Sequence, residues 1–128
     1  MRSPMVIDIE DVLAPIAGES PAGNDLRASR RASGSFAMLK QARTAARSAE
    51  RKLSVSDDQA EAVRPNWRPV CDVASKVLRE ESKDLEVAAY LIEALVRLHG
   101  FAGLRDGFRL CRGLIECDAH ASPSYVWR

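Results

Sequence analysis

The longest apolar stretch of the chain covers residues 85 to 98, and its polar positions are spaced like one stripe of a helix. They follow one another at intervals of four, three and four residues: Glu86, Tyr90, Glu93 and Arg97. A helix with one narrow polar stripe is buried over most of its surface. The pattern therefore predicts the central helix of a helical domain, with an exposed ion pair between Glu93 and Arg97. The core residues expected within it are Leu85, Leu91 and Leu95.

The ends of this helix can also be predicted. Asp84 is a suitable N-cap, because its carboxylate can accept a hydrogen bond from an N–H of the first turn. Gly100 can adopt the left-handed conformation that ends a helix. A second helix is expected from Phe101 to Cys117, and so short a connection predicts an antiparallel helix hairpin.

The apolar residues of this second helix recur at intervals of three and four: Phe101, Leu104, Phe108, Cys111 and Ile115. We expect Phe101, Leu104 and Phe108 in the core. Gly103 and Gly107 lie four residues apart on one face, where glycine lowers helix propensity. Close approach of another backbone, that of the central helix, would offset this loss. A frayed turn at Gly103 is the alternative.

Three further helices are expected. A short one is capped by Asp8 and ends before Pro15, one spans Ser35–Leu53 with Ser35 as its cap, and one spans Trp67–Glu81 with Asn66 as its cap and Trp67 in the core. The predicted fold is all-α, a compact bundle of about five helices forming a single domain over residues 1–128. Residues 118–128 show no helical periodicity and are either a disordered tail or a segment that folds back on the bundle.

The segment PIAGESPAGNDLR, residues 15–27, combines prolines and glycines in a non-helical path. Two interpretations stay open. The loop either straps the N-terminal helix over the bundle or contacts a partner, since loops on a rigid scaffold often carry function. Asp25 would bond backbone N–H groups under the first interpretation. The candidate residues of the loop are Pro15, Ile16, Pro21, Gly23, Asp25 and Leu26.

The helix expected at 35–53 has a basic outer face, formed by Lys40, Arg43, Arg47 and Arg51. Between residues 27 and 52, eight basic residues stand against Glu50 alone. A solvated helix face is the favoured interpretation, and an anionic partner, either protein or nucleic acid, is the alternative. No stacking aromatic residues accompany this face, which disfavours single-stranded nucleic acid.

Composition adds little to this picture. The net charge of +1, with 46% hydrophobic and 29% charged residues, is typical of a soluble domain. Three cysteines without framework spacing favour a reducing compartment, and no signal peptide is visible. No catalytic constellation, phosphate-binding loop or paired metal-ligand motif is present, so we expect neither an enzyme nor a cofactor, metal site or small-molecule substrate.

The order of three segments carries a family resemblance: LAPIAGESPAGNDLR, then NWRPVCDVASKVL, then SKDLEVAAYLIEALVRLHGFAGLRDGFRLCRGL. It resembles the ImpA-type N-terminal domain of TssA proteins from the bacterial type VI secretion system, over about residues 13–114. The family commonly continues into an aromatic stretch similar to YWDxLHP, whereas residues 116–128 read ECDAHASPSYVWR. Full TssA proteins carry further C-terminal domains, so the resemblance implies that the chain is the N-terminal part of a longer protein.

The resemblance implies a non-catalytic structural role. Such proteins act in the cytoplasm, at the inner face of the cell envelope, during assembly of the baseplate and of the tail tube and sheath. The implied partners are proteins of the baseplate, the tail and the membrane complex. Self-association stays open, because an uncovered apolar helix face would favour it. A nucleic-acid-binding domain that uses residues 40–52 is the alternative function, and it would bind less tightly as salt rises.

Overall fold

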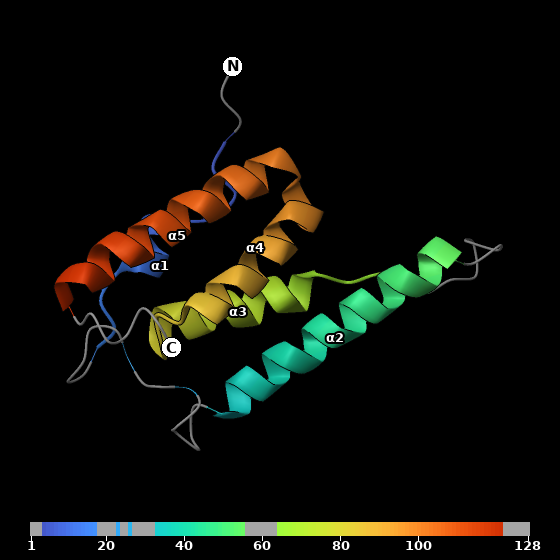
Figure 1. The fold of residues 1–128 in the computed structure, drawn as a ribbon, viewed down its shortest axis with the longest axis horizontal. Coiled ribbons are helices and arrows are strands. Elements are labelled where there is room, and N and C mark those ends of the chain that lie inside the picture. The colour runs from blue at the N-terminus through green and yellow to red at the C-terminus, as the bar shows by residue number, and fades with distance from the viewer. Residues whose placement is uncertain (1–3, 18–22, 24–25, 27–32, 56–63, 122–128) are drawn as a thin grey trace.

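The computed structural model describes residues 4–17, 23, 26, 33–55 and 64–121, and every structural statement below concerns these residues. They form five helices, labelled in Figure 1: α1 (Ile9–Leu13), α2 (Ser33–Val55), α3 (Arg68–Glu80), α4 (Leu85–His99) and α5 (Phe101–Ala121). The predicted all-α fold, with an antiparallel hairpin in the C-terminal half, is confirmed.

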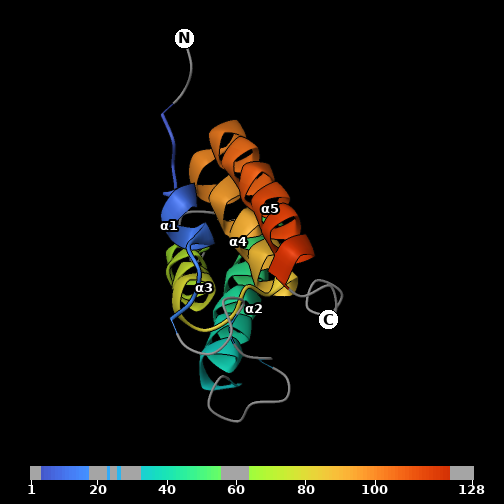
Figure 2. The ribbon, with the colours of Figure 1, turned by 90° about the vertical axis from the view of Figure 1, so that its left-hand side faces the viewer.

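The helices stack in the order α5, α4, α3 and α2, and the short α1 contacts both α5 and α3 (Figures 1 and 2). Helix α4 therefore lies between α5 and α3, as expected of a central helix. Its residues Leu91 and Leu95 are fully buried, and Trp67 is buried just before α3 begins. Leu85 is half-buried and packs against the same core.

The predicted caps of α1 and α4 are confirmed. The Asp8 carboxylate accepts a hydrogen bond from the Asp11 N–H at 3.1 Å. The Asp84 carboxylate accepts from the N–H groups of Glu86 and Val87, at 2.8 and 3.2 Å. Helix α4 ends at Gly100, whose φ of +60° is strained for any residue with a side chain. These local signals set where the helices begin and end.

Three helix ends differ from the prediction. Helix α2 begins at Ser33, so Ser35 lies inside the helix and its hydroxyl donates to the Glu81 carboxylate at 3.1 Å instead of capping. The N-cap of α3 is Trp67, one residue after the predicted cap, although the Asn66 side chain does accept from the Arg68 N–H at 3.2 Å. Helix α5 continues to Ala121 and includes the start of the segment predicted to lack helix.

Helices α4 and α5 approach each other through glycine, as predicted. A Cβ atom added to Gly103 would lie 2.0 Å from the carbonyl oxygen of Leu95. A Cβ atom on Gly107 would lie 2.7 Å from Cγ1 of Ile92. Both distances are far below van der Waals contact: a Cβ atom at Gly103 would overlap the backbone of α4, and one at Gly107 would overlap the Ile92 side chain. The helices can come this close because neither residue has a side chain. The frayed-turn alternative at Gly103 is thereby excluded.

Two predictions were made for α5, and only the one that turns its glycines toward α4 holds. The side of α5 that faces the bundle carries Gly103 and Gly107, together with fully buried Leu110 and Leu114. The row that starts at Phe101 lies about 100° around the helix from this side, because most of its members directly follow a bundle-facing residue. The prediction that Phe101 and Phe108 are core residues is wrong, since 89% and 62% of their surfaces are exposed. Leu104, in the same row, is only half-buried.

Among the described residues, no helix is both long enough and apolar enough to cross a lipid bilayer. Helix α5 has the length but carries charged residues along most of its course, including Arg105, Asp106, Arg109 and Arg112.

Candidate protein-interaction surfaces

Three described residues of the 15–27 loop lie against the bundle, namely Ile16, Gly23 and Leu26, whereas Pro15 and Ala17 are exposed. Ile16 and Leu26 are buried. Gly23 forms an isolated antiparallel bridge with Ser82, between α3 and α4. Its φ is +82°, and a Cβ atom there would lie 2.2 Å from the carbonyl oxygen of Glu81. Only glycine can therefore hold this contact.

Pro15 is exposed, whereas Pro21 and Asp25 fall outside the described residues. The contacts of Ile16, Gly23 and Leu26 favour the interpretation that these positions strap the N-terminal helix over the bundle. A docking role for Pro21 and Asp25 stays a prediction.

The contact of Gly23 with Ser82 lies beside a buried lysine, Lys83, whose burial the sequence pattern did not predict. Lys83 is only 4% exposed. Its ammonium group donates to the carbonyl oxygen of Leu78 at 2.7 Å and also to that of Val12. Both carbonyls lie near helix C-termini, where the helix dipole favours positive charge. Lys83 thus joins the end of α1 to the end of α3, and this accounts for a charge at a buried position.

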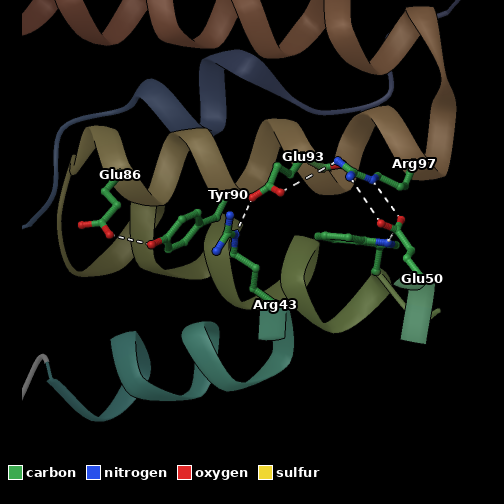
Figure 3. Close-up of polar contacts among 7 residues, drawn as sticks. Arg43, Glu50, Glu86, Tyr90, Glu93 and Arg97 are labelled. Carbon is green, nitrogen blue, oxygen red and sulfur yellow. Dashed lines mark hydrogen bonds and ion pairs between the residues drawn. The ribbon is translucent and has the colours of Figure 1, made fainter. Parts of the chain in front are cut away.

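The polar stripe of α4 faces α2 (Figure 3). The Arg43 guanidinium donates to the Glu93 carboxylate at 2.5 Å and lies over the Tyr90 ring, 4.6 Å from its centre. The bond to Glu93 raises the pKa of Arg43. The Tyr90 hydroxyl in turn donates to Glu86, and burial together with this bond raises the pKa of Tyr90.

The same stripe continues to the end of α4. Arg97 donates to Glu50 of α2 at 3.0 Å and lies over the Trp67 ring, 4.5 Å from its centre. The Trp67 indole N–H donates to the same Glu50 carboxylate at 2.8 Å. Arg97 also lies 3.9 Å from Glu93, so the predicted pair within α4 is present but belongs to a larger network. The polar stripe is therefore the contact by which α4 reaches α2.

This network changes the interpretation of the basic face of α2. Arg43 points into the interface with α4, whereas Lys40, Arg47 and Arg51 are exposed. Lys40 lies over the Phe36 ring, 4.5 Å from its centre. The outer basic face therefore loses one of its four predicted members to an internal ion pair. Its structure gives no specific support to nucleic-acid binding.

A buried carboxylate anchors the N-terminal segment to α5. Asp106 is fully buried and accepts from the Val6 N–H at 2.8 Å and from Arg105 at 2.8 Å. Arg105 also donates to the carbonyl oxygen of Pro4 at 2.9 Å. The bond from Arg105 is the main cause that lowers the pKa of Asp106. The sequence pattern did not predict this anchor, because Val6 and Asp106 lie 100 residues apart in the chain.

Three of the exposed large apolar side chains among the described residues lie along one row of α5. We call this the outer row, and it is formed by Phe101, Leu104, Phe108, Cys111 and Ile115. Phe101, Phe108 and Ile115 are 89%, 62% and 50% exposed. Leu104 and Cys111 lie between them and are half-buried. Burial raises the pKa of the Cys111 thiol, which makes it a poor nucleophile. The row is thus an apolar surface rather than a chemical site.

Arginines border this outer row on one side. Arg105, Arg109 and Arg112 each follow a residue of the row directly, so they lie about 100° around the helix from it. Arg112 pairs with Glu116 at 2.9 Å, and Arg109 lies 3.8 Å from the Asp106 carboxylate. We call these three residues the arginine border. The outer row includes Phe101 and Phe108, which were predicted to lie in the core and are mostly exposed.

Comparison with known proteins places the chain in a family. The family model described as "ImpA, N-terminal, type VI secretion system" matches residues 13–120. The type VI secretion system component TssA1 of Pseudomonas aeruginosa is 34% identical over 110 residues, which are 86% of this chain and 29% of that protein. This chain therefore spans less than a third of the relative's length.

A solved structure agrees. It is the N-terminal domain, including the conserved ImpA_N region, of the TssA component of the type VI secretion system from Burkholderia cenocepacia. The two share 33% sequence identity with a TM-score of 0.60, over 87% of this chain and 36% of the other. Both the fold and the sequence match, so this chain belongs to the ImpA N-terminal family of type VI secretion system TssA proteins.

Proposed function

We propose that this chain is a non-catalytic adaptor domain of a TssA-like protein, which contacts other proteins while a type VI secretion machine is assembled. The candidate partners are components of the baseplate, of the tail tube and sheath, and of the membrane complex. The proposed place of action is the cytoplasm, at the inner face of the envelope. Membership of the family supports a role in the type VI secretion system. The exposed outer row of α5 supports a role through protein–protein contact.

The outer row carries this proposal because it is a large apolar surface on a rigid element. Helix α5 is held to α4 through glycine and to the N-terminal segment through Asp106. Two phenylalanines and an isoleucine nevertheless point away from these contacts. Contiguous exposed apolar residues of this kind mark protein interaction sites, and aromatic residues supply much of the binding energy there. An adaptor that works by surface complementarity needs such a surface and no reactive group.

The test is a pull-down of the chain against separately expressed baseplate, tail-tube, sheath and envelope components of the same secretion system. The test variant is Phe101→Ser combined with Phe108→Ser, and the matched control is Arg47→Glu on the exposed face of α2. We expect the wild-type chain and the control to retain one component in high salt. Retention by the double serine variant should fall at least about tenfold, because each phenylalanine contributes about 1 kcal/mol or more at an interface.

Two results would count against the proposal. Retention that survives in the double serine variant but disappears in Arg47→Glu would move the contact to the basic face of α2. Retention of none of the components by the wild-type chain would mean that other parts of the protein supply the binding, and this domain would then be a spacer.

A further inference from the structure

The outer row of α5 has the spacing of a coiled-coil seam. Phe101, Phe108 and Ile115 recur every seven residues, and Leu104 and Cys111 lie three residues after the first two. This is the a and d pattern of a heptad, in which each side chain inserts between four residues of a facing helix. From Phe101 to Ile115 the seam is about 21 Å long at 1.5 Å per residue. A surface of this shape fits a helix better than a strand or a loop.

The two sides of the seam differ. On one side lies the arginine border, with Arg109 53% and Arg112 81% exposed in their side chains. On the other side, the residues that directly precede the row are Gly103, Gly107, Leu110 and Leu114, and these face the bundle. A helix on the seam therefore meets positive charge along one edge only. Two carboxylates offset part of this charge: Glu116 pairs with Arg112, and Asp106 pairs with Arg105 and lies 3.8 Å from Arg109, which leaves three arginines against two acidic groups.

This asymmetry disfavours a second copy of the chain as the occupant. In an antiparallel pair of α5 helices, each arginine border would face the arginine border of the copy, and like charges would repel. In a parallel pair, the arginine border would meet the side of the copy that its own α4 already covers. Neither arrangement pairs the arginines with carboxylates.

We propose that the outer row of α5 receives an amphipathic helix of another protein, whose apolar seam is bordered by aspartate or glutamate. This inference rests on the proposed adaptor function and names the kind of element that would bind. The phenylalanines supply the apolar contact, and the arginine border selects an acidic edge and sets the direction of the bound helix. Guanidinium groups suit this task because they bond carboxylates with two parallel N–H donors.

The probes are two synthetic helical peptides of about three heptads, with identical Leu and Ile at their a and d positions. One carries Glu at the positions beside the seam, and its twin carries Lys there. Binding of each to the whole 128-residue chain is measured by fluorescence polarisation at low and high salt. We expect the Glu peptide to bind about tenfold more tightly at low salt, and we expect added salt to reduce this preference.

Three variants sharpen the test. Phe101→Ser with Phe108→Ser should lose binding of both peptides by at least about tenfold. Arg112→Glu with Arg109→Glu should reverse the preference, so that the Lys peptide binds more tightly than the Glu peptide. Arg47→Glu makes a charge change on α2, away from the seam, and should leave the preference within about twofold of the wild type.

The inference is overturned if both peptides bind equally, if neither binds, or if sedimentation shows a dimer that Phe108→Ser dissolves. The pull-down separates these results from failure of the proposed function. If the double serine variant loses its partner while the two peptides bind equally or not at all, docking at the outer row stands and the acidic helix is wrong. If the pull-down also fails, the adaptor function is wrong with it.

Discussion

The two faces of α5 are built from different kinds of residue and contact different things. The inner face combines small residues with one buried carboxylate: Gly103, Asp106, Gly107, Leu110 and Leu114. The outer face carries Phe101, Phe108 and Ile115, which are 50% to 89% exposed. Helix packing here depends on how closely two backbones approach, and small residues allow that approach. Large residues are then left for a contact outside the domain.

A second contrast lies on the two sides of α4. Toward α5, the backbone of α4 at Leu95 lies directly against Gly103, so a side chain at that position does not fit. Toward α2 it makes long polar contacts through Arg43, Glu93, Arg97 and Glu50. These side chains are about one quarter to one third exposed, so salt and water weaken their pairing. We therefore expect substitutions to have the largest effect at the inner face of α5 and smaller effects at the α2 interface.

The largest expected effect is that of Gly103→Ala. The new Cβ atom would lie 2.0 Å from the Leu95 carbonyl oxygen, a backbone atom that cannot rotate away, so α4 and α5 must separate. We expect a loss of about 3 kcal/mol in the free energy of unfolding, measured by urea titration. Gly34→Ala is the matched control, because a Cβ atom there meets nothing within 4 Å. A loss of equal size in both variants would contradict the close contact.

Asp106→Ala comes next. It removes the acceptor for Val6 and Arg105, frees the N-terminal segment and leaves the half-buried Val6 N–H without this acceptor. We expect the free energy of unfolding to fall by about 2 kcal/mol at neutral pH. Proteolysis near residues 4–7 should also become faster, as mass spectrometry of the fragments would show. Unchanged proteolysis would mean that other contacts hold this segment.

The pH dependence of stability gives a related prediction for Asp106→Asn. The folded state lowers the pKa of Asp106 below its unfolded value of about 4. The stabilisation by the ionised carboxylate is therefore complete above about pH 4 and is lost as pH falls through the lower, folded pKa. In that acidic range, the free energy of unfolding of the wild type, measured by urea titration, should fall toward that of Asp106→Asn. A difference that stays constant from neutral to acidic pH would contradict the ion pair.

A smaller effect is expected at the α2 interface. Arg43→Ala and Glu93→Ala should each lower the free energy of unfolding by about 1 kcal/mol, and the double variant should lose less than the sum. Both side chains are about one quarter exposed, so added salt should reduce the coupling. Exact additivity of the two losses would show that the pair does not form in solution.

Local sequence signals predicted the helices well because caps and periodicity act over a few residues. Asp8, Asp84 and Gly100 each mark a helix end through their own hydrogen bonds or backbone angles. The glycine contact of α5 was also predictable, since Gly103 and Gly107 have no other reason to lie four apart in a helix. These features need no knowledge of distant parts of the chain.

The orientation of α5 was not predictable in this way. Both of its faces show helical periodicity, and the stronger hydrophobic signal comes from the outer row of Phe101, Phe108 and Ile115. Periodicity identifies a row but does not say whether the domain or a partner covers it. The glycines indicated the face that packs on α4. The close approach that they allow decides the orientation of α5, and the size of the apolar side chains does not.

The charged anchors were missed for a similar reason. Lys83 and Asp106 are buried because backbone groups 71 and 100 residues away along the chain contact them. Nothing in their neighbouring sequence distinguishes them from exposed charges, which are far more common. Arg43 likewise appeared to belong to an outer basic face until α4 was placed beside α2.

The central claim is that the inner face of α5 holds the domain while the outer row binds a partner. Its most direct test measures both the urea midpoint and partner retention for Phe101→Ser combined with Phe108→Ser. Both residues are mostly exposed, so we predict a free energy of unfolding within about 0.5 kcal/mol of the wild type per site, and at least about a tenfold loss of retention. A marked fall in stability with retention unchanged per folded molecule would contradict the claim.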